Sequence, residues 1–290
     1  MKLYAILPLI CLALIIGCDL SSVDPGGGAS SPTDVSLRGA PPETNGGDGG
    51  GGGPVNGHVE LDVPPGTLLG QIQFDGTFQK LPARIPKALI TADPAVCGKA
   101  GDILDESLVV DSGTNGVANV FIYLAKRPDW LDKKPEWDPQ DKPLEGIDQL
   151  YCVFTPHALL ARTGKFVLKN SDAATHNVKS GSKLVSFNLS MSPGAEDSVE
   201  FNRAEKEPFA SSCAIHAWMA FYTLVIDHPY AAVTDEKGMF RIENLPAGTH
   251  EFRVWQERGG LIDRKFTVTV PSGAETELQV RKYPASKFNL

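Results

Sequence analysis

The sequence predicts an all-β protein built as a sandwich or barrel, and three observations support this. Short apolar runs that alternate with polar residues recur along the chain after residue 65. Glycine, proline, asparagine or aspartate bounds each run, as is typical of strands joined by turns. No segment after the N-terminal apolar run has the periodicity of an amphipathic helix. Regularly spaced short strands of this kind are typical of β-sandwiches.

The first 17 residues resemble a secretory signal sequence. An early lysine precedes an apolar run from Leu3 to Ile16, which is too short to span a bilayer. The run ends in Gly17-Cys18, which resembles the lipobox of bacterial lipoproteins. A plain signal peptide with an incidental cysteine is the alternative. We expect residues 1–17 to be removed and Cys18 to carry a lipid that anchors the exported, periplasmic protein to a bacterial membrane.

Residues 18–65 predict a flexible tether. The stretch TNGGDGGGGGPVNG lies within it, and the segment has almost no large apolar side chains. Such a chain cannot bury enough surface to offset the entropy that it would lose on ordering. Its end-to-end reach is about 35–40 Å. A folded head on a lipid tether is therefore expected.

Three β segments follow the tether. Residues 66–147 begin with the alternating run GQIQFDG and contain SLVVDSGTNGVANVFIYL, which predicts two strands around a turn. They end in the proline-rich stretch 127–146, which is too polar for a core element and predicts a long surface loop. Residues 148–226 carry further strand-like runs. Residues 227–290 include TDEKGMFRIENLPAGTHEFRVW, which alternates around two turns.

Charge and motifs exclude several classes of function. The formal net charge is −8, and no run of lysine and arginine is present to bind nucleic acid. The signatures of serine hydrolases, zinc proteases, c-type haem attachment, phosphate loops and dinucleotide binding are missing from the sequence. The sequence thus favours a binding or carrier protein over an enzyme.

The stretch CAIHAWM, residues 213–219, places Cys213, His216 and Met219 at intervals of three. These positions do not share one face of a strand, because the strand period is two, and the stretch is too short to predict a helix. A blue-copper site needs two imidazoles, one thiolate and a weak axial thioether. We therefore expect a ligand loop at the end of a strand, with the second imidazole supplied from elsewhere.

A second imidazole is available in GKFVLKNSDAATHNV, where His176 lies 37 residues before Cys213. Together with CAIHAWM, this segment resembles the cupredoxins in the version with the short amicyanin-type loop, over about residues 148–226. The resemblance implies a Greek-key β-sandwich and a mononuclear copper ion. The ligands that it implies are His176, Cys213, His216 and Met219. It also implies that Asn177 supports the site through a hydrogen bond toward the cysteine loop.

The rest of the chain resembles bacterial periplasmic proteins labelled methylamine utilization proteins. The segments that carry this resemblance are GQIQFDG, DPAVCGK, VANVFIYL, YCVFTPHALLARTG and DHPYAAVTDEKGMFRIENLPAGTHEFRVWQE. It implies carboxypeptidase regulatory-like, transthyretin-type β elements beside the cupredoxin part. The implied function is a lipid-anchored electron carrier with a redox partner protein. A copper-free binding or structural lipoprotein of the cell envelope and a copper-handling protein are the alternatives.

Three cysteines remain beyond the lipidated one, and sequence alone leaves all three of their pairings open. The copper site requires a free thiolate at Cys213, so we expect a disulfide between Cys97 and Cys152. A disulfide at Cys213 would abolish the site. Trp218, inside the ligand loop, is expected to anchor the core or to belong to an apolar patch that shields the copper.

The other histidines of the β segments are expected to be structural. His157 follows a proline in FTPHALL and is expected in a turn. His250 has the same strand parity as Phe252. His228, in IDHPY, is expected in a surface turn, or as an alternative ligand if His176 is not one.

Overall fold

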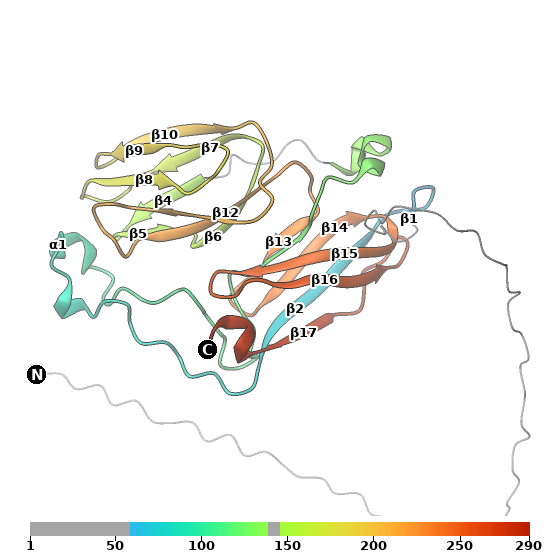
Figure 1. Ribbon diagram of the computed structural model, residues 1–290, viewed down its shortest axis with the longest axis horizontal. Helices are drawn as coiled ribbons and strands as arrows, with labels where there is room; N and C mark the ends of the chain where they lie inside the picture. The colour runs from blue at the N-terminus through green and yellow to red at the C-terminus, as the bar shows by residue number, and fades with distance from the viewer. Residues whose placement is uncertain (1–58, 139–145) are drawn as a thin grey trace, which may run out of the picture. The chain divides into compact units, whose positions relative to one another are not determined.

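The computed structural model describes residues 59–138 and 146–290 (Figure 1). The expected signal sequence, Cys18 and most of the expected tether lie outside the described residues. Nearly all regular structure in the described ranges is β, so the all-β prediction is confirmed. Within these ranges, no helix has both the length and the apolar composition needed to cross a membrane.

The described residues form the following elements. The strands are β1 (Val59–Glu60), β2 (Gly66–Asp75), β3 (Phe121–Leu124), β4 (Gly146–Leu150), β5 (Val153–Thr155), β6 (Ala158–Arg162), β7 (Gly164–Lys169), β8 (His176–Ser180), β9 (Asn188–Met191), β10 (Glu196–Phe201), β11 (Phe209–Ser212), β12 (Ala220–Ile226), β13 (Ala231–Val233), β14 (Met239–Leu245), β15 (Ala247–Gln256), β16 (Gly260–Val270) and β17 (Gln279–Pro284). The helices are α1 (Pro94–Cys97) and the 3-10 turns η1 (Lys87–Leu89), η2 (Asp129–Lys133), η3 (Pro135–Trp137) and η4 (Ala285–Phe288).

One pair of sheets joins the beginning and the end of the described chain, and we call it the enclosing sandwich. One sheet has the strand order β1-β15-β3-β13, with β16 also paired to β15, and the other has the order β14-β2-β17. β2 pairs with β14 antiparallel and with β17 parallel, and Figure 1 shows β2 in blue beside β17 in red. Strands from the predicted segments 66–147 and 227–290 thus share the same two sheets.

A second pair of sheets lies between β3 and β13 in the chain, and we call it the inserted sandwich. Its sheets have the orders β10-β7-β4-β5 and β6-β12-β11-β8-β9, and they are built from residues 146–226. Their facing side chains form one apolar core that includes Phe166, Leu168, Val178 and Phe221. Each core side chain of this kind contributes roughly 1.5–3 kcal/mol through burial.

Burial follows the pattern of each strand. In β16, Ile262, Phe266 and Val268 are buried while Lys265 and Thr267 are exposed, which is the period of two expected for a strand with one solvent face. In β12, by contrast, apolar residues are buried on both faces. One face belongs to the core of the inserted sandwich, and the other joins an apolar cluster that also holds side chains of β3 and β15. This explains the unbroken apolar run of β12 in the sequence.

Two predictions for the region before the inserted sandwich were wrong. The stretch 127–146 is not simply a surface loop, because η2 and η3 place Trp130 and Trp137 in the core of the enclosing sandwich. The centre of the Trp130 ring lies 5.0 Å from the centre of the Tyr230 ring. The free energy gained by burying these large rings favours packing in the core, although the residues next to the tryptophans in the sequence are polar. Of the two strands expected in SLVVDSGTNGVANVFIYL, the second is β3, but the first is reduced to an isolated bridge between Val110 and Val117.

A closed loop over residues 85–103, which we call the strap, carries η1 and α1. Ile85 and Ile103 exchange backbone hydrogen bonds of 3.2 and 2.9 Å, which bring the two ends of the strap together. Ile90, Cys97 and Ile103 are buried in the core of the inserted sandwich. The strap therefore belongs by its packing to the inserted sandwich, although it precedes that sandwich in the sequence.

Candidate metal centre

The loop from Cys213 to Met219 connects two neighbouring antiparallel strands of the inserted sandwich. It follows β11 directly and ends where β12 begins. The amide of Cys213 donates to the carbonyl of Met219 over 3.2 Å, and the amide of Met219 donates to the carbonyl of His216 over 2.9 Å. These hydrogen bonds close the loop, so its three expected ligands are held by one rigid turn at the end of a strand.

His176 is the first residue of β8, which pairs with β11 and so lies beside the loop. The turn before it is organised by the buried amide of Asn170. That amide group donates to the carbonyls of Ala174 and Met191, each over 2.9 Å, and its oxygen accepts from the amide of Asp172. These hydrogen bonds hold the short turn that leads into His176.

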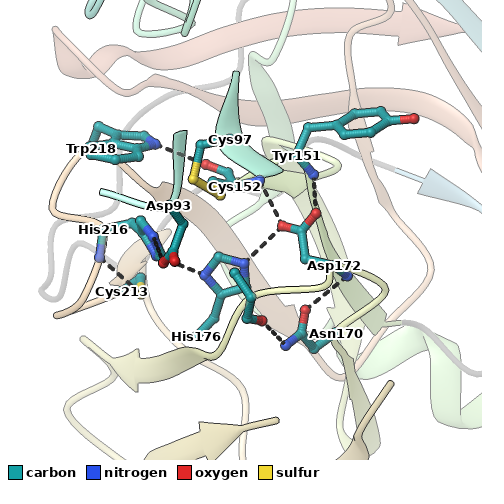
Figure 2. The surroundings of a disulfide bond; sticks show 11 residues. Asp93, Cys97, Tyr151, Cys152, Asn170, Asp172, His176, Cys213, His216 and Trp218 are labelled. Atoms are coloured by element: carbon teal, nitrogen blue, oxygen red, sulfur yellow. Dashed lines mark hydrogen bonds and ion pairs between the residues drawn. A yellow bond between two sulfur atoms is a disulfide. The ribbon is translucent and has the colours of Figure 1, made fainter. Parts of the chain in front are cut away.

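Three of the four expected ligands converge. Ligand atoms of His176, Cys213 and His216 all lie within 4.8 Å of one another, and all three residues are buried (Figure 2). The two Nδ1 atoms of the histidines are 2.9 Å apart. Metal–nitrogen bonds of about 2.0–2.1 Å place two nitrogens on one ion roughly 3 Å apart. The spacing of the two rings therefore fits a common ion.

Met219 and Asn177 lie around this group. Met219 is 1 % exposed and bonds through its backbone to Cys213 and His216. The side-chain oxygen of Asn177 accepts from the amide of Ala214 over 2.7 Å and lies 3.4 Å from the Cys213 sulfur. Asn177 thus ties β8 to the cysteine loop, as the resemblance implied.

The protonation of the metal-free centre follows from its hydrogen bonds. Burial opposes a charge on His176, but hydrogen bonds to Cys213 and Asp172 outweigh it and raise the pKa of His176. Burial, and then the charge of His176, lower the pKa of His216. Burial opposes ionisation of Cys213, but the hydrogen bond from His176 and backbone amides outweigh it and lower its pKa. The centre thus combines an imidazole with a raised pKa and a thiol with a lowered pKa, so positive charge is favoured beside Cys213.

Asp172 supports the centre, and sequence reasoning missed it. One carboxylate oxygen accepts from the amide of Tyr151 over 2.6 Å, and the other accepts from the amide of Cys152 over 2.7 Å. The second oxygen also accepts from Nε2 of His176 at 2.8 Å. A carboxylate behind a ligating imidazole fixes the ring orientation and raises its basicity as a ligand. The only sequence signal was an aspartate four residues before the histidine.

Asp93 plays the same part for His216. Its carboxylate lies 3.0 Å from Nε2 of His216, although the two residues are 123 positions apart in the chain. Asp93 precedes α1 in the strap and adopts a left-handed backbone conformation with φ of 45°. The strap thereby caps the outer edge of the His216 ring. No local pattern predicts a contact across such a separation, so Asp93 could not be predicted from the sequence.

Cys97 and Cys152 form a disulfide, and Cys213 is a buried free thiol. The disulfide joins α1 of the strap to the turn between β4 and β5. Trp218 is half-buried, and its ring nitrogen donates to the carbonyl of Cys152 over 2.9 Å. Its ring lies 5.1 Å from that of His216, so Trp218 covers the imidazole on one side.

The other histidines lie outside this cluster. Nε2 of His157 meets the carboxylate of Glu257 at 2.6 Å, and His250 donates from Nε2 to a backbone carbonyl over 2.8 Å. His228 is buried rather than exposed in a surface turn, and its ring stacks on that of Tyr230. Among the described residues, the groups of three possible metal ligands include none of these histidines.

Comparison with known proteins gives only distant likenesses in structure. No protein family matches the sequence, and no curated protein matches it. Amicyanin from Paracoccus versutus is 17 % identical with a TM-score of 0.26, over 30 % of this chain and 83 % of that chain. A purple cupredoxin from Nitrosopumilus maritimus is 18 % identical with a TM-score of 0.25, over 28 % and 98 %. A copper-containing nitrite reductase from Thermus scotoductus SA-01 is 15 % identical with a TM-score of 0.28, over 30 % of this chain and 23 % of that one.

The donor set decides which metals suit the centre. One thiol and two imidazoles converge, and the same loop carries the buried Met219, so the available donors form a soft-to-borderline set with low formal charge. Magnesium and calcium prefer oxygen ligands, whereas copper accepts a trigonal thiolate and imidazole set with a weak axial thioether. The residues present therefore fit copper.

Proposed function

We propose that this chain is a mononuclear blue-copper protein that carries electrons. The convergence of the His176 and His216 Nδ1 atoms on the free Cys213 thiol supports this proposal most strongly. The ligands in the proposal are His176, Cys213, His216 and Met219. Bound copper would supply one-electron transfer between Cu(I) and Cu(II), at a potential tuned by the axial ligand and the apolar surroundings.

The surrounding residues hold the proposed ligands in place and exclude water from them. The rings of His176 and His216 have no exposed surface, and each is held at Nε2 by a carboxylate. The loop is closed by backbone hydrogen bonds, and Asn177 ties it to β8. Ligands that cannot move favour transfer of an electron, which needs little rearrangement. They disfavour transfer of the copper ion to another protein, because that step requires the ligands to dissociate from the metal. We therefore favour electron carriage over copper handling.

The absorption spectrum tests this function. The purified protein, loaded with Cu(II), is expected to show an intense visible band from the thiolate of Cys213. Cys213→Ala should abolish the band, whereas the control Ser211→Ala, in β11 just before the loop, should keep it. Voltammetry should show reversible one-electron exchange without loss of copper to a Cu(I) chelator. A colourless copper-loaded protein with a titratable Cys213 thiol would refute the proposal.

The cellular location in the proposal is a bacterial membrane facing the periplasm, reached through a lipid on Cys18. The lipobox-like sequence before Cys18 supports it. A tethered carrier can meet both membrane and soluble redox partners. Metabolic labelling with a fatty acid, compared between the wild-type chain and Cys18→Ser, tests the anchor, since only the wild-type chain should take up the label.

A further inference from the structure

The Cys97–Cys152 disulfide lies against the outer side of both imidazoles of the centre. The two sulfurs and one ring nitrogen of His216 all lie within 4.8 Å of one another. The sulfur of Cys152, a carboxylate oxygen of Asp172 and a nitrogen of His176 satisfy the same limit. Figure 2 shows the disulfide above the two rings, beside Asp93 and Trp218. A disulfide that served only to join two segments could lie at other positions, away from the two histidine rings.

We propose that reduction of the Cys97–Cys152 disulfide creates a second soft-metal site, in which the two thiolates and the His216 imidazole bind Cu(I). A soluble dithiol supplies two electrons and two protons and becomes a disulfide itself. The Cys97–Cys152 bond breaks, and each sulfur takes up one of the protons. Cu(I) then displaces both protons as it binds. Two thiolates and an imidazole form a soft set that selects Cu(I) over the harder divalent ions.

Both sulfurs are held near His216 by contacts other than the disulfide. The turn that carries Cys152 is fixed by the two amide hydrogen bonds to Asp172. The strap that carries Cys97 is closed by the hydrogen bonds between Ile85 and Ile103. The strap is also joined to His216 through Asp93. After reduction, therefore, the two thiols remain beside the ring instead of separating.

The backbone gives a second, independent reason to regard this place as functional. Tyr151 and Cys152 form the two-residue connection between β4 and β5, and both have positive φ, at 54° and 58°. Turns of that kind normally take Asn-Gly, because other side chains are disfavoured there. Asp93, on the strap, also has positive φ. Left-handed backbone at residues other than glycine costs about 1–3 kcal/mol and concentrates at functional sites.

The test separates this site from the blue-copper centre by removing the thiolate of that centre. The full chain with Cys213→Ser is prepared oxidised, and a second sample is reduced with dithiothreitol and freed of it without oxygen. Thiol titration should find two more thiols in the reduced sample than in the oxidised sample, because only the Cys97–Cys152 bond differs between them. In competition with a coloured Cu(I) chelator, the reduced sample should bind one more equivalent of Cu(I) than the oxidised sample. Far-UV circular dichroism checks that both remain folded.

The role of His216 is tested in the same background. His216→Ala should weaken the additional Cu(I) binding by more than about tenfold, because even residues that only orient a ligand typically cost that much. The control His228→Ala should leave it unchanged. X-ray absorption should show sulfur and nitrogen neighbours around the copper. A disulfide that resists reduction, loss of the fold on reduction, no additional equivalent, or equal affinity in His216→Ala would each overturn the proposal.

These outcomes are independent of the proposed electron carriage. A blue band in the wild-type chain, with no additional Cu(I) bound after reduction of Cys213→Ser, would remove only the second site. A colourless wild-type chain whose reduced Cys213→Ser variant gains one Cu(I) would remove only the first.

Discussion

The two sandwiches both bury histidines, but among the described residues only the inserted sandwich brings two of them together with a thiol. His176 and His216 use both ring nitrogens, with Nδ1 toward each other and Nε2 toward a carboxylate. His228 and His250, which pack with the enclosing sandwich, meet backbone groups instead. A buried histidine alone therefore does not mark a ligand. The convergence of two ring nitrogens on a thiol distinguishes the candidate centre.

The pKa directions express the same difference. Burial lowers the pKa of His250, and burial lowers the pKa of His228 to about 4. Burial acts in the same direction on His176, yet the adjacent thiol and carboxylate reverse the outcome. A histidine that must stay neutral inside a core and a histidine prepared to hold a cation thus differ in their partners rather than in their exposure.

Exchanging the two kinds of histidine for alanine should give the largest contrast. His176→Ala should abolish the visible band of the copper-loaded protein while the chain stays folded. His250→Ala should keep the band but lower the free energy of unfolding by about 1–3 kcal/mol, because a buried carbonyl loses its donor. Visible spectra and urea unfolding measure both effects. A visible band that persists in His176→Ala would contradict the view that His176 and His216 bind copper while His228 and His250 do not.

Removing the charge of the carboxylate that holds His176 should have the next largest effect on copper binding. Asp172→Asn keeps the shape of the side chain but removes its charge from Nε2 of His176. We expect copper affinity to fall about 10- to 100-fold in competition with a chelator. The control is Asp263→Asn in the enclosing sandwich, where the carboxylate accepts from the hydroxyl of Tyr283 at 3.0 Å. Equal affinity in the two variants would show that Asp172 has no special role.

Lowering the pH should reduce the stability of the fold through His228, which burial keeps neutral. The unfolded chain protonates His228 near its ordinary pKa of 6.5, and the folded chain only near about 4. The unfolded state therefore binds more protons below pH 6.5, and stability falls as the pH falls and levels off below pH 4. From pH 7 to pH 5 this group alone should lower the free energy of unfolding by about 2 kcal/mol.

The comparison with His228→Gln isolates this contribution. Urea unfolding of the metal-free proteins at both pH values should show a smaller decrease in the variant, by about the amount assigned to His228. The same decrease in both proteins would mean that His228 does not carry the effect.

Removing one hydrogen bond beside the centre should have the smallest effect. Trp218→Phe keeps an aromatic ring near His216 but removes the donor to the carbonyl of Cys152. We expect the free energy of unfolding to fall by about 1 kcal/mol while the visible band is kept. Loss of the band would show that Trp218 does more than cover the imidazole.

Local patterns allowed much of the fold and part of the centre to be predicted from sequence. Alternation identified β2, β14, β15 and β16, because each has one face in a core. The odd spacing of Cys213, His216 and Met219 predicted a loop at the end of a strand, and the loop lies there. The cysteine pair expected from the need for a free thiol is the pair that the structure joins.

Contacts between distant segments could not be predicted in this way. Asp93 contacts His216, which lies 123 residues later in the chain. The strap likewise packs into the inserted sandwich, whose strands all come after it in the sequence. Trp130 and Trp137 lie in a polar sequence, and they are buried because Trp130 packs against Tyr230 and Trp137 packs against Trp130. Periodicity reports which face of an element is apolar, and carries no information on which element will cover it.

The pairing of β2 with β14 and β17 has a consequence for how the protein is made. Synthesis delivers β2 first, and more than 150 residues follow before its neighbours β14 and β17 exist. During that interval the hydrogen-bonding edges of β2 are open, and such edges invite pairing with other chains. The inserted sandwich, whose strands all pair with one another, can form in the meantime. The chain therefore has an order of assembly in which the inserted sandwich can fold before the enclosing sandwich is finished, and residues 279–284 complete the enclosing sandwich.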